Sequence, residues 1–191
     1  MRYHLFKSLI ITACMITLCC FGYVLIVRLL AVFAPGGGLG VVVRDAQQQI
    51  VGYVQIGQPF TSDRYFWGRP SAIDYDASQS GGTNLAPSNP LLIQQVSQRI
   101  KYFETRNPEI SVSQIPVDLV TASGSGLDPD ISPEAAFVQV KRVAQARHIP
   151  ERVVDSLVQA YIQPPLLHLL GPAHVNVLQL NLVLDKVSAS P

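Results

Sequence analysis

The sequence predicts a mixed α/β fold, with one N-terminal transmembrane helix followed by a single extracytoplasmic mixed α/β domain. Three observations carry this prediction. Residues 9–27 are an uncharged and mainly apolar run, short segments rich in β-branched residues follow it, and apolar residues recur at helical spacing further along. The 191 residues suffice for one medium-sized domain plus the membrane segment. We expect the helix over residues 8–33, a linker over 34–40 and the domain over 41–187.

The apolar run is long enough to be an uncleaved membrane anchor. Residues 29–33 extend it past Arg28, and a helix that crosses the hydrocarbon core needs about 20 residues. A cleaved signal peptide is the alternative, but its apolar region usually has only about 7–15 residues. Arg2 and Lys7 precede the run, which favours a cytoplasmic N-terminus and an extracytoplasmic domain. Arg28 weakens this charge asymmetry, although its long side chain can reach the interface from near the helix end.

The cysteines and the charges exclude several kinds of ligand. All three cysteines, Cys14, Cys19 and Cys20, lie inside the predicted helix, so the domain has no disulfide and no thiolate metal site. Beyond residue 34 the chain has all 13 acidic residues but 11 of the 14 basic ones, a net charge of 11 − 13 = −2 with neutral histidines. Nucleic acid requires a basic surface. We therefore expect no nucleic-acid partner.

The first half of the domain is predicted to contain a hairpin and a long loop. Residues 34–40 (APGGGLG) form a flexible break after the anchor. Residues 41–43 and 50–56 are rich in β-branched residues and predict two strands, joined by a polar connection. Residues 57–89 predict a loop, and a loop of this length in a compact domain is usually functional or disordered. Its aromatic residues argue against disorder; they are Tyr65, Phe66, Trp67 and Tyr75.

The second half alternates helices and short strands. Asn89 and Pro90 predict the cap and first turn of a helix that ends near Arg106. The next elements are predicted in this order: a short strand over 115–121, a glycine-rich loop over 122–130, a helix from Ser132-Pro133 to about Arg147, a helix from Pro150 to Pro164-Pro165, and a strand over 175–184. In that last segment leucines alternate with Val177, Gln179 and Asn181, so one predicted face is apolar and the other is mixed.

Both glycine-rich loops lead into predicted helix N-termini, where unpaired amides and the helix dipole can hold a phosphate or a carboxylate. The alternative is that their glycines and serines only form turns and caps. The chain has no G-x-x-x-x-G-K-[ST] phosphate loop, and Gly124-Ser125-Gly126 does not extend to the G-x-S-x-G nucleophile turn. The histidines form no recognisable zinc pattern. Asp118, Asp128 and Asp130 could bind calcium weakly, but Asp128 and Asp130 beside Pro129 are more simply turn residues. We therefore predict no catalytic and no metal-binding residue.

Five segments together resemble one protein family. They are residues 66–72 (FWGRPSA), 80–90 (SGGTNLAPSNP), 116–129 (PVDLVTASGSGLDP), 131–136 (ISPEAA) and 175–178 (VNVL). With these segments in the family's order behind the expected anchor, the chain resembles the C subunit of the Kdp-type bacterial potassium-transporting ATPase. One segment departs from the pattern. The family typically has Gly-Glu-Pro-Arg before Val-Asn-Val, whereas this chain has Gly171-Pro-Ala-His174.

The resemblance implies an accessory, non-catalytic subunit of a bacterial high-affinity, ATP-driven potassium uptake complex in the cell inner membrane. Its implied partners are a channel-like potassium-selecting subunit, a P-type ATPase subunit and a small single-span subunit, besides the membrane lipid. Potassium would be the transported ion and ATP the cofactor of the complex. The C subunit would assist assembly and act as a catalytic chaperone that raises the ATP affinity of the ATPase subunit. No autonomous activity is expected.

The resemblance also implies candidate nucleotide contacts, which are Ser80, Gly81, Gly82, Thr83 and Asn84. The predicted topology places these residues outside the cytoplasm, where ATP is absent. We therefore expect both glycine-rich loops to be contact surfaces that cap or stabilise the potassium entrance of the channel-like subunit. Two rival hypotheses remain open. One is a membrane-anchored extracytoplasmic enzyme or ligand-binding domain, and the other is direct ATP binding by a cytoplasmic domain.

Overall fold

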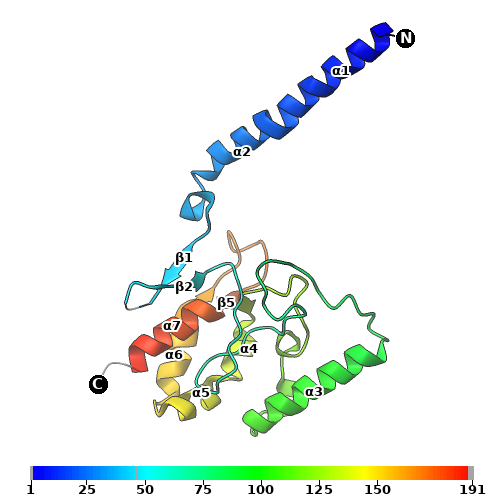
Figure 1. The fold of residues 1–191 in the computed structure, drawn as a ribbon. Helices are drawn as coiled ribbons and strands as arrows, with labels where there is room; N and C mark the ends of the chain where they lie inside the picture. Colours follow the sequence, from blue (N-terminus) through cyan, green and yellow to red (C-terminus); the bar gives the residue numbers. More distant parts are fainter. Residues whose placement is uncertain (1, 46, 189–191) are drawn as a thin grey trace. The chain divides into compact units, whose positions relative to one another are not determined.

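The N-terminal part of the chain is one long apolar helix. The computed structural model describes residues 2–45 and 47–188 and divides into two compact units between Val42 and Val43. In the first unit, α1 (Arg2–Ile16), a π-helical segment (Thr17–Tyr23) and α2 (Val24–Ala31) follow one another without a break (Figure 1). The stretch Tyr3–Ala31 reaches a mean hydropathy of 2.5 and is long and apolar enough to cross a membrane. The predicted N-terminal helix is therefore confirmed, and a 3-10 turn over Pro35–Gly38 follows it.

The second unit begins within a small hairpin. The strands β1 (Val42–Arg44) and β2 (Ile50–Tyr53) form a two-stranded sheet. Between them, the Asp45 carboxylate accepts hydrogen bonds from the backbone N–H groups of Gln47 and Gln49, both at 2.9 Å. An aspartate that bonds the backbone two residues on is typical of turns. The predicted hairpin is confirmed, with a second strand that ends at Tyr53 instead of at residue 56.

The helices start where the sequence places their caps. The helix α3 (Pro90–Arg106) has the predicted bounds, and the Asn89 side chain accepts a hydrogen bond from the Leu91 N–H. Ser132 caps α4 (Pro133–Phe137) in the same way through the Ala135 N–H. The predicted helix over 133–147 is in fact two helices, since α5 (Val140–Arg147) starts after a break at Gln139. The next helix, α6 (Glu151–Tyr161), ends earlier than predicted because the chain continues into a strand.

A three-stranded antiparallel sheet lies at the centre of this unit. Its strands β3 (Asp130–Ile131), β4 (Ile162–Gln163) and β5 (His174–Asn176) are arranged in the order β3-β5-β4. Ile131 and Ile162 both pair with Val175, which is fully buried. The sheet therefore joins the ends of segments that are far apart in the sequence.

The predicted strand over residues 175–184 is wrong beyond its first two residues. The chain leaves β5 at Asn176 and forms α7 (Val177–Ser188). The alternating leucines suggested a strand, but another set of residues in the same segment fits a helical period. Val177, Leu180, Asn181 and Leu184 share one helix face and are all buried. The helical period prevails because Asn181 has polar partners inside the domain.

The predicted strand over residues 115–121 is also wrong. Two 3-10 turns occupy this region, Val112–Gln114 and Val117–Leu119. Pro116 lacks an N–H group and cannot donate to a sheet. The Asp118 carboxylate accepts a hydrogen bond from the Ser132 N–H at 2.7 Å, which ties this region to the start of α4. Local β-propensity is thus overridden by a side-chain contact to another segment.

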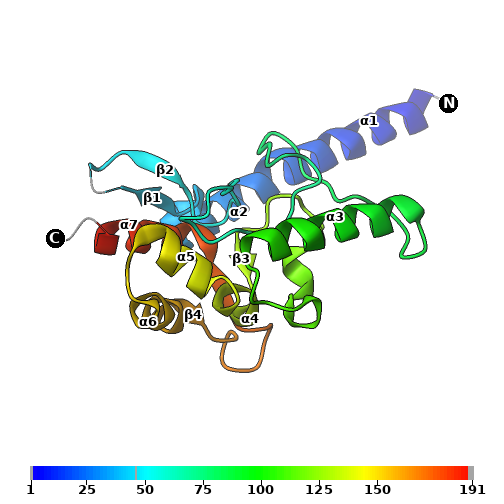
Figure 2. The same ribbon diagram turned by 90° about the horizontal axis from the view of Figure 1, so that it is seen from below.

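The hydrophobic core lies among α5, α6, α7 and the three-stranded sheet. In both ribbon views these three helices lie together at one end of the unit, and α3 lies at the other end (Figures 1 and 2). The largest fully buried apolar side chains are Phe66, Ile131, Val143, Val154, Val158, Val175, Leu180 and Leu184. Phe66 comes from the long loop, so this loop is part of the core and not a covering of it.

Candidate functional site

Two buried amide side chains, Gln139 just before α5 and Asn181 in α7, hold the segment around Phe66 and Trp67. The Phe66 N–H donates to Asn181 Oδ1 at 2.8 Å, and Asn181 Nδ2 donates to the Phe66 carbonyl at 3.0 Å. Gln139 makes the equivalent pair with Trp67, accepting from its N–H at 2.8 Å and donating to its carbonyl at 3.2 Å. Each primary amide therefore satisfies both peptide groups of one residue, as a neighbouring strand would. The predicted order of the loop over 57–89 is confirmed here.

Two buried arginines of α5 strengthen this attachment. The Arg142 guanidinium lies 3.8 Å from the centre of the Trp67 ring and donates to the carbonyls of Asp63 and Tyr65. Burial is the main cause that lowers the pKa of Arg142 to about 10. Arg147 donates to the Arg64 carbonyl at 2.6 Å and pairs with the Asp185 carboxylate of α7 at 2.7 Å. Sequence reasoning missed Gln139, Arg142, Arg147 and Asn181, and their only signal is a polar residue on an otherwise apolar helix face.

The two glycine-rich loops pack against each other. The Gly81 N–H donates to the Ser125 carbonyl at 2.9 Å, and the Ser80 hydroxyl donates to the same carbonyl at 3.2 Å. The Ser123 N–H donates to the Pro70 carbonyl at 3.0 Å, which joins the second loop to the segment that follows Trp67. We call residues 80–82 and 123–126 the paired loops. The structure therefore brings together two motifs that lie more than 40 residues apart in the sequence.

Glycine is required in the paired loops at one position above all. Gly126 has φ +72°, and a Cβ atom there would lie 2.5 Å from Ile73 Cγ1 and 2.9 Å from the Gly81 carbonyl oxygen. At Gly82 a Cβ atom would lie 3.2 Å from the Gly124 carbonyl oxygen, which is tight, whereas at Gly124 it would meet nothing within 4 Å. The sequence pointed to Gly81 and Gly82 as the important glycines. In the structure, the two loops come closest to each other at Gly126, where a side chain would not fit.

Some of the amides that the sequence offered to an anion have partners within the domain. Of the five candidate nucleotide contacts, Ser80 and Gly81 bond Ser125, and Gly82 lies against Gly124. Thr83 and Asn84 continue towards α3, and Asn84 is exposed with φ +52°. In the second loop, the Gly126 N–H donates to the Ser123 hydroxyl at 2.9 Å. The helix caps at Asn89 and Ser132 likewise use their own side chains. These bonds favour a packed loop surface over an open amide cradle at Gly81 and Gly126.

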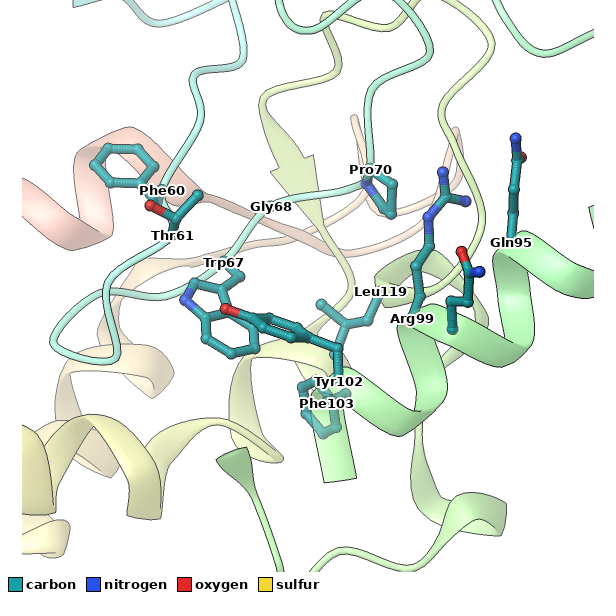
Figure 3. Close-up of a pocket in the computed structure, with 11 residues that line it drawn as sticks. Phe60, Thr61, Trp67, Gly68, Pro70, Gln95, Arg99, Tyr102, Phe103 and Leu119 are labelled. Atoms are coloured by element: carbon teal, nitrogen blue, oxygen red, sulfur yellow. The ribbon is translucent and has the colours of Figure 1, made fainter. Parts of the chain in front are cut away.

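A pocket of about 540 Å³ lies between α3 and the segment that carries Trp67 (Figure 3). The Trp67 and Tyr102 rings stack with their centres 5.3 Å apart, and Phe103 meets Trp67 edge to face. Arg99 and Gln95 lie on the α3 side of the pocket (Figure 3), and Arg99 donates to the Val120 carbonyl. Among the described residues, none of the five candidate nucleotide contacts lines it. Its aromatic wall and its polar rim suit an apolar group with an attached acceptor.

The segment that departs from the family pattern borders an acidic hollow. His174 Nε2 lies 3.9 Å from Asp130 Oδ2, and Asn176 Nδ2 donates to Asp130 Oδ1 at 2.9 Å. Arg69 pairs with Asp128 at 2.9 Å beside them. Burial is the largest influence on Asp130 and raises its pKa above 3.8.

Asp130 should make the domain less stable as the pH rises. Because its pKa is raised in the folded state, that state retains a proton that the unfolded chain has already lost. The free energy of unfolding therefore falls as the pH rises from about 4 through the raised pKa. The Asp130→Asn variant should lack this fall, which urea denaturation at several pH values would measure.

Asp76→Asn is the control of opposite sign for this measurement. Hydrogen bonds with Ser78 lower the pKa of Asp76, so the wild-type carboxylate stabilises the folded state above its ordinary pKa and loses this effect as the pH falls. A pH profile that Asp130→Asn leaves unaltered would contradict the assignment.

The fold and the site define a class of protein. It combines a helix long and apolar enough to cross a membrane with an α/β domain whose most specific motifs form two hydrogen-bonded loops.

The comparison with known proteins assigns this class to a family. The family described as "KdpC: K+-transporting ATPase, c chain" matches residues 5–186. A relative from Flavobacterium psychrophilum is 46% identical over 184 residues, covering 96% of this chain and 98% of the relative. One from Bacteroides thetaiotaomicron is 44% identical over 95% of this chain and 97% of its own length. One from Caldanaerobacter subterraneus is 54% identical over 70% of this chain and 69% of its own length. All three are called "Potassium-transporting ATPase KdpC subunit". The chain belongs to this family and is a subunit of a potassium-transporting ATPase.

Proposed function

We propose that this chain is an accessory subunit of a high-affinity potassium uptake complex in the bacterial inner membrane. Its partners would be a channel-like potassium-selecting subunit, a P-type ATPase subunit that hydrolyses ATP, and a small single-span subunit. The anchor helix would cross the membrane with its N-terminus in the cytoplasm. The α/β domain would then lie outside and act where potassium enters the channel-like subunit. The membership in the family supports this role.

The observation that carries the proposal is the structure of the paired loops. Four of their donors, the Ser80 hydroxyl and the N–H groups of Gly81, Ser123 and Gly126, are bonded within the domain. Two buried amide side chains, one just before α5 and one in α7, hold the segment that precedes Pro70. Such a surface loses little conformational freedom when it binds another protein. We therefore assign the paired loops as the surface that caps or stabilises the potassium entrance.

The contact between the paired loops and the channel-like subunit would also explain how this chain raises the ATP affinity of the ATPase subunit without binding ATP itself. A subunit that binds one conformation of the complex more tightly shifts the complex towards that conformation. The domain would in this way act as a catalytic chaperone and raise the ATP affinity of the ATPase subunit. Direct nucleotide contacts at Ser80, Gly81, Gly82, Thr83 and Asn84 are the second candidate, which the resemblance of their motif favours. It requires the domain to face the cytoplasm, because ATP is there.

The topology separates the two candidates. After replacement of Cys14, Cys19 and Cys20, a Ser97→Cys variant carries one thiol on an exposed position of α3. We expect a membrane-impermeant maleimide to label it in intact cells. A Lys7→Cys variant in the same background is the control and should react only after the membrane is permeabilised. Labelling of residue 97 only after permeabilisation would overturn the outer-face role and support direct ATP binding.

A further inference from the structure

The pocket between α3 and the Trp67 segment has the size and the walls of a site for a small molecule. Its volume of about 540 Å³ falls in the range of roughly 300–1,000 Å³ that ligand pockets usually have. Most of its wall is apolar, and the side chains that form this part are Phe60, Trp67, Pro70, Tyr102, Phe103 and Leu119. The wall is rich in flat rings (Figure 3), and a flat aromatic ligand gains more from such rings than from the area that it buries alone.

Arg99 brings to this pocket a half-buried cation that has no carboxylate partner. Among the described residues, its guanidinium bonds only the Val120 carbonyl, through Nη1 at 3.0 Å. Burial is the larger influence on the pKa of Arg99 and lowers it, and the opposing influence comes from Tyr75 and not from a carboxylate. The remaining N–H groups of the guanidinium are therefore available to a ligand.

The lack of a carboxylate distinguishes Arg99 from the other arginines that this domain buries fully or in part. Arg69, Arg142 and Arg147 each have an aspartate within 4.0 Å, as a buried charge requires. Gln95 lines the same pocket one turn before Arg99, and its buried Oε1 atom has no hydrogen-bond partner among the described residues. Buried polar groups are almost always bonded. The α3 side of the pocket is therefore incomplete without a further partner.

We propose that this pocket binds a small aromatic carboxylate. Its ring would lie among the aromatic side chains around Trp67 and Tyr102, and its carboxylate would accept hydrogen bonds from Arg99. A guanidinium presents parallel N–H groups that match the two oxygens of a carboxylate. A rigid ring also loses less conformational freedom on binding than an alkyl chain of similar size. The proposal depends on this pocket alone, so it holds whether or not the paired loops act at the potassium entrance.

The fluorescence of Trp67 provides a direct measurement, because this residue lines the pocket and is the single tryptophan of the chain. The purified full-length chain would be titrated with phenylacetate and with phenylacetamide, its neutral amide of nearly the same shape. We expect a saturable change with phenylacetate and a dissociation constant about tenfold lower than that of phenylacetamide, which lacks the charge for Arg99. Equal dissociation constants, or no saturable change with phenylacetate, would overturn the proposal.

A third ligand tests the aromatic part of the proposal. Octanoate carries the same carboxylate on a flexible alkyl chain, and we expect it to bind about threefold more weakly than phenylacetate, because it has no ring to stack and more freedom to lose. Binding as tight as that of phenylacetate, or tighter, would contradict the aromatic class and assign the pocket to alkyl carboxylates.

Three variants test the role of Arg99. Arg99→Gln should bring the affinities of the two phenyl ligands to within about twofold of each other, while Arg99→Lys should retain part of the difference because it retains the charge. Arg152→Gln removes an exposed arginine of α6 and should leave the difference unchanged. Thermal unfolding would show whether each variant is folded, and the comparison of ligands on the unaltered chain depends on none of them. A preference for phenylacetate that persists in folded Arg99→Gln would overturn the assignment of Arg99.

Discussion

Replacing Asn181 with alanine should remove about 3–5 kcal/mol from the free energy of unfolding of the domain. The substitution leaves both peptide groups of the buried Phe66 without their partners, and each orphaned buried group costs about 1–3 kcal/mol. A small cavity adds to this cost. Because whole domains have stabilities of about 5–15 kcal/mol, this single change would remove a large share. Chemical denaturation of the full chain, followed by the fluorescence of its single tryptophan, Trp67, would measure the loss.

Asn89→Ala is the matched control for this prediction. It deletes the same side chain, whose carbonyl also accepts a backbone hydrogen bond, but the bond lies at an exposed helix cap. Such a cap contributes about 1 kcal/mol. Equal losses in both variants would contradict the view that Asn181 holds the long loop in the core.

Replacing Gly126 with alanine should lower potassium uptake by the complex about tenfold, a change equivalent to about 1.4 kcal/mol. The residue has φ +72°, and the new methyl group would lie 2.9 Å from the Gly81 carbonyl oxygen and 2.5 Å from Ile73 Cγ1. The Ile73 side chain can move, but the Gly81 backbone cannot move without breaking its bond to Ser125. The paired loops must then separate. Potassium uptake and the ATP concentration at half-maximal ATPase activity would report the effect, the first decreasing and the second increasing.

The paired loops provide a graded series of controls. Gly124→Ala should keep uptake within about twofold of the wild type, since a methyl group there meets nothing within 4 Å and no left-handed backbone is involved. Gly82→Ala, with a contact of 3.2 Å to the Gly124 carbonyl oxygen, should lie between the two. Thermal unfolding of each variant would separate a lost surface from a lost fold. Equal uptake in all three variants would show that the shape of the paired loops does not matter for transport.

Some of the fold could be predicted from the sequence because it depends on near neighbours. The bounds of α3 follow from Asn89-Pro90 at one end and from Asn107-Pro108 at the other. The order of the long loop follows from its aromatic residues. The strand predicted over 175–184 was wrong because the leucines alternate with a period of 2, while a different set, Val177, Leu180, Asn181 and Leu184, fits the helical period of 3.6. The helical period places Asn181 on the buried face, where its side chain accepts the hydrogen bond of the Phe66 N–H. This contact with a distant segment decides between a strand and a helix.

The residues of the candidate site also fall into those that the sequence predicted and those that it did not. Ser80, Gly81 and Gly82 could be named from their motif, and so could the loop that contains Ser125. That the two loops bond each other could not be predicted, since no local rule joins residues 45 positions apart. The buried polar residues Gln139 and Arg142 were missed for a related reason. A polar side chain on a helix can face solvent or a peptide group, and its own sequence neighbours do not distinguish these cases.

The membrane-anchor candidate, the helix caps and the family follow from the sequence, because hydrophobic length, capping and motif order are properties of contiguous residues. The tertiary structure alone decided what the glycine-rich loops do. In the folded domain the Gly81 N–H donates to the Ser125 carbonyl, and the Phe66 N–H donates to Asn181, 115 residues away. Gly126 is the loop position at which a side chain would have the closest contacts. The physical reason is that a hydrogen-bond donor has no fixed partner until the chain is packed. The partner, and with it the choice between an anion cradle and a contact surface, comes from the packing.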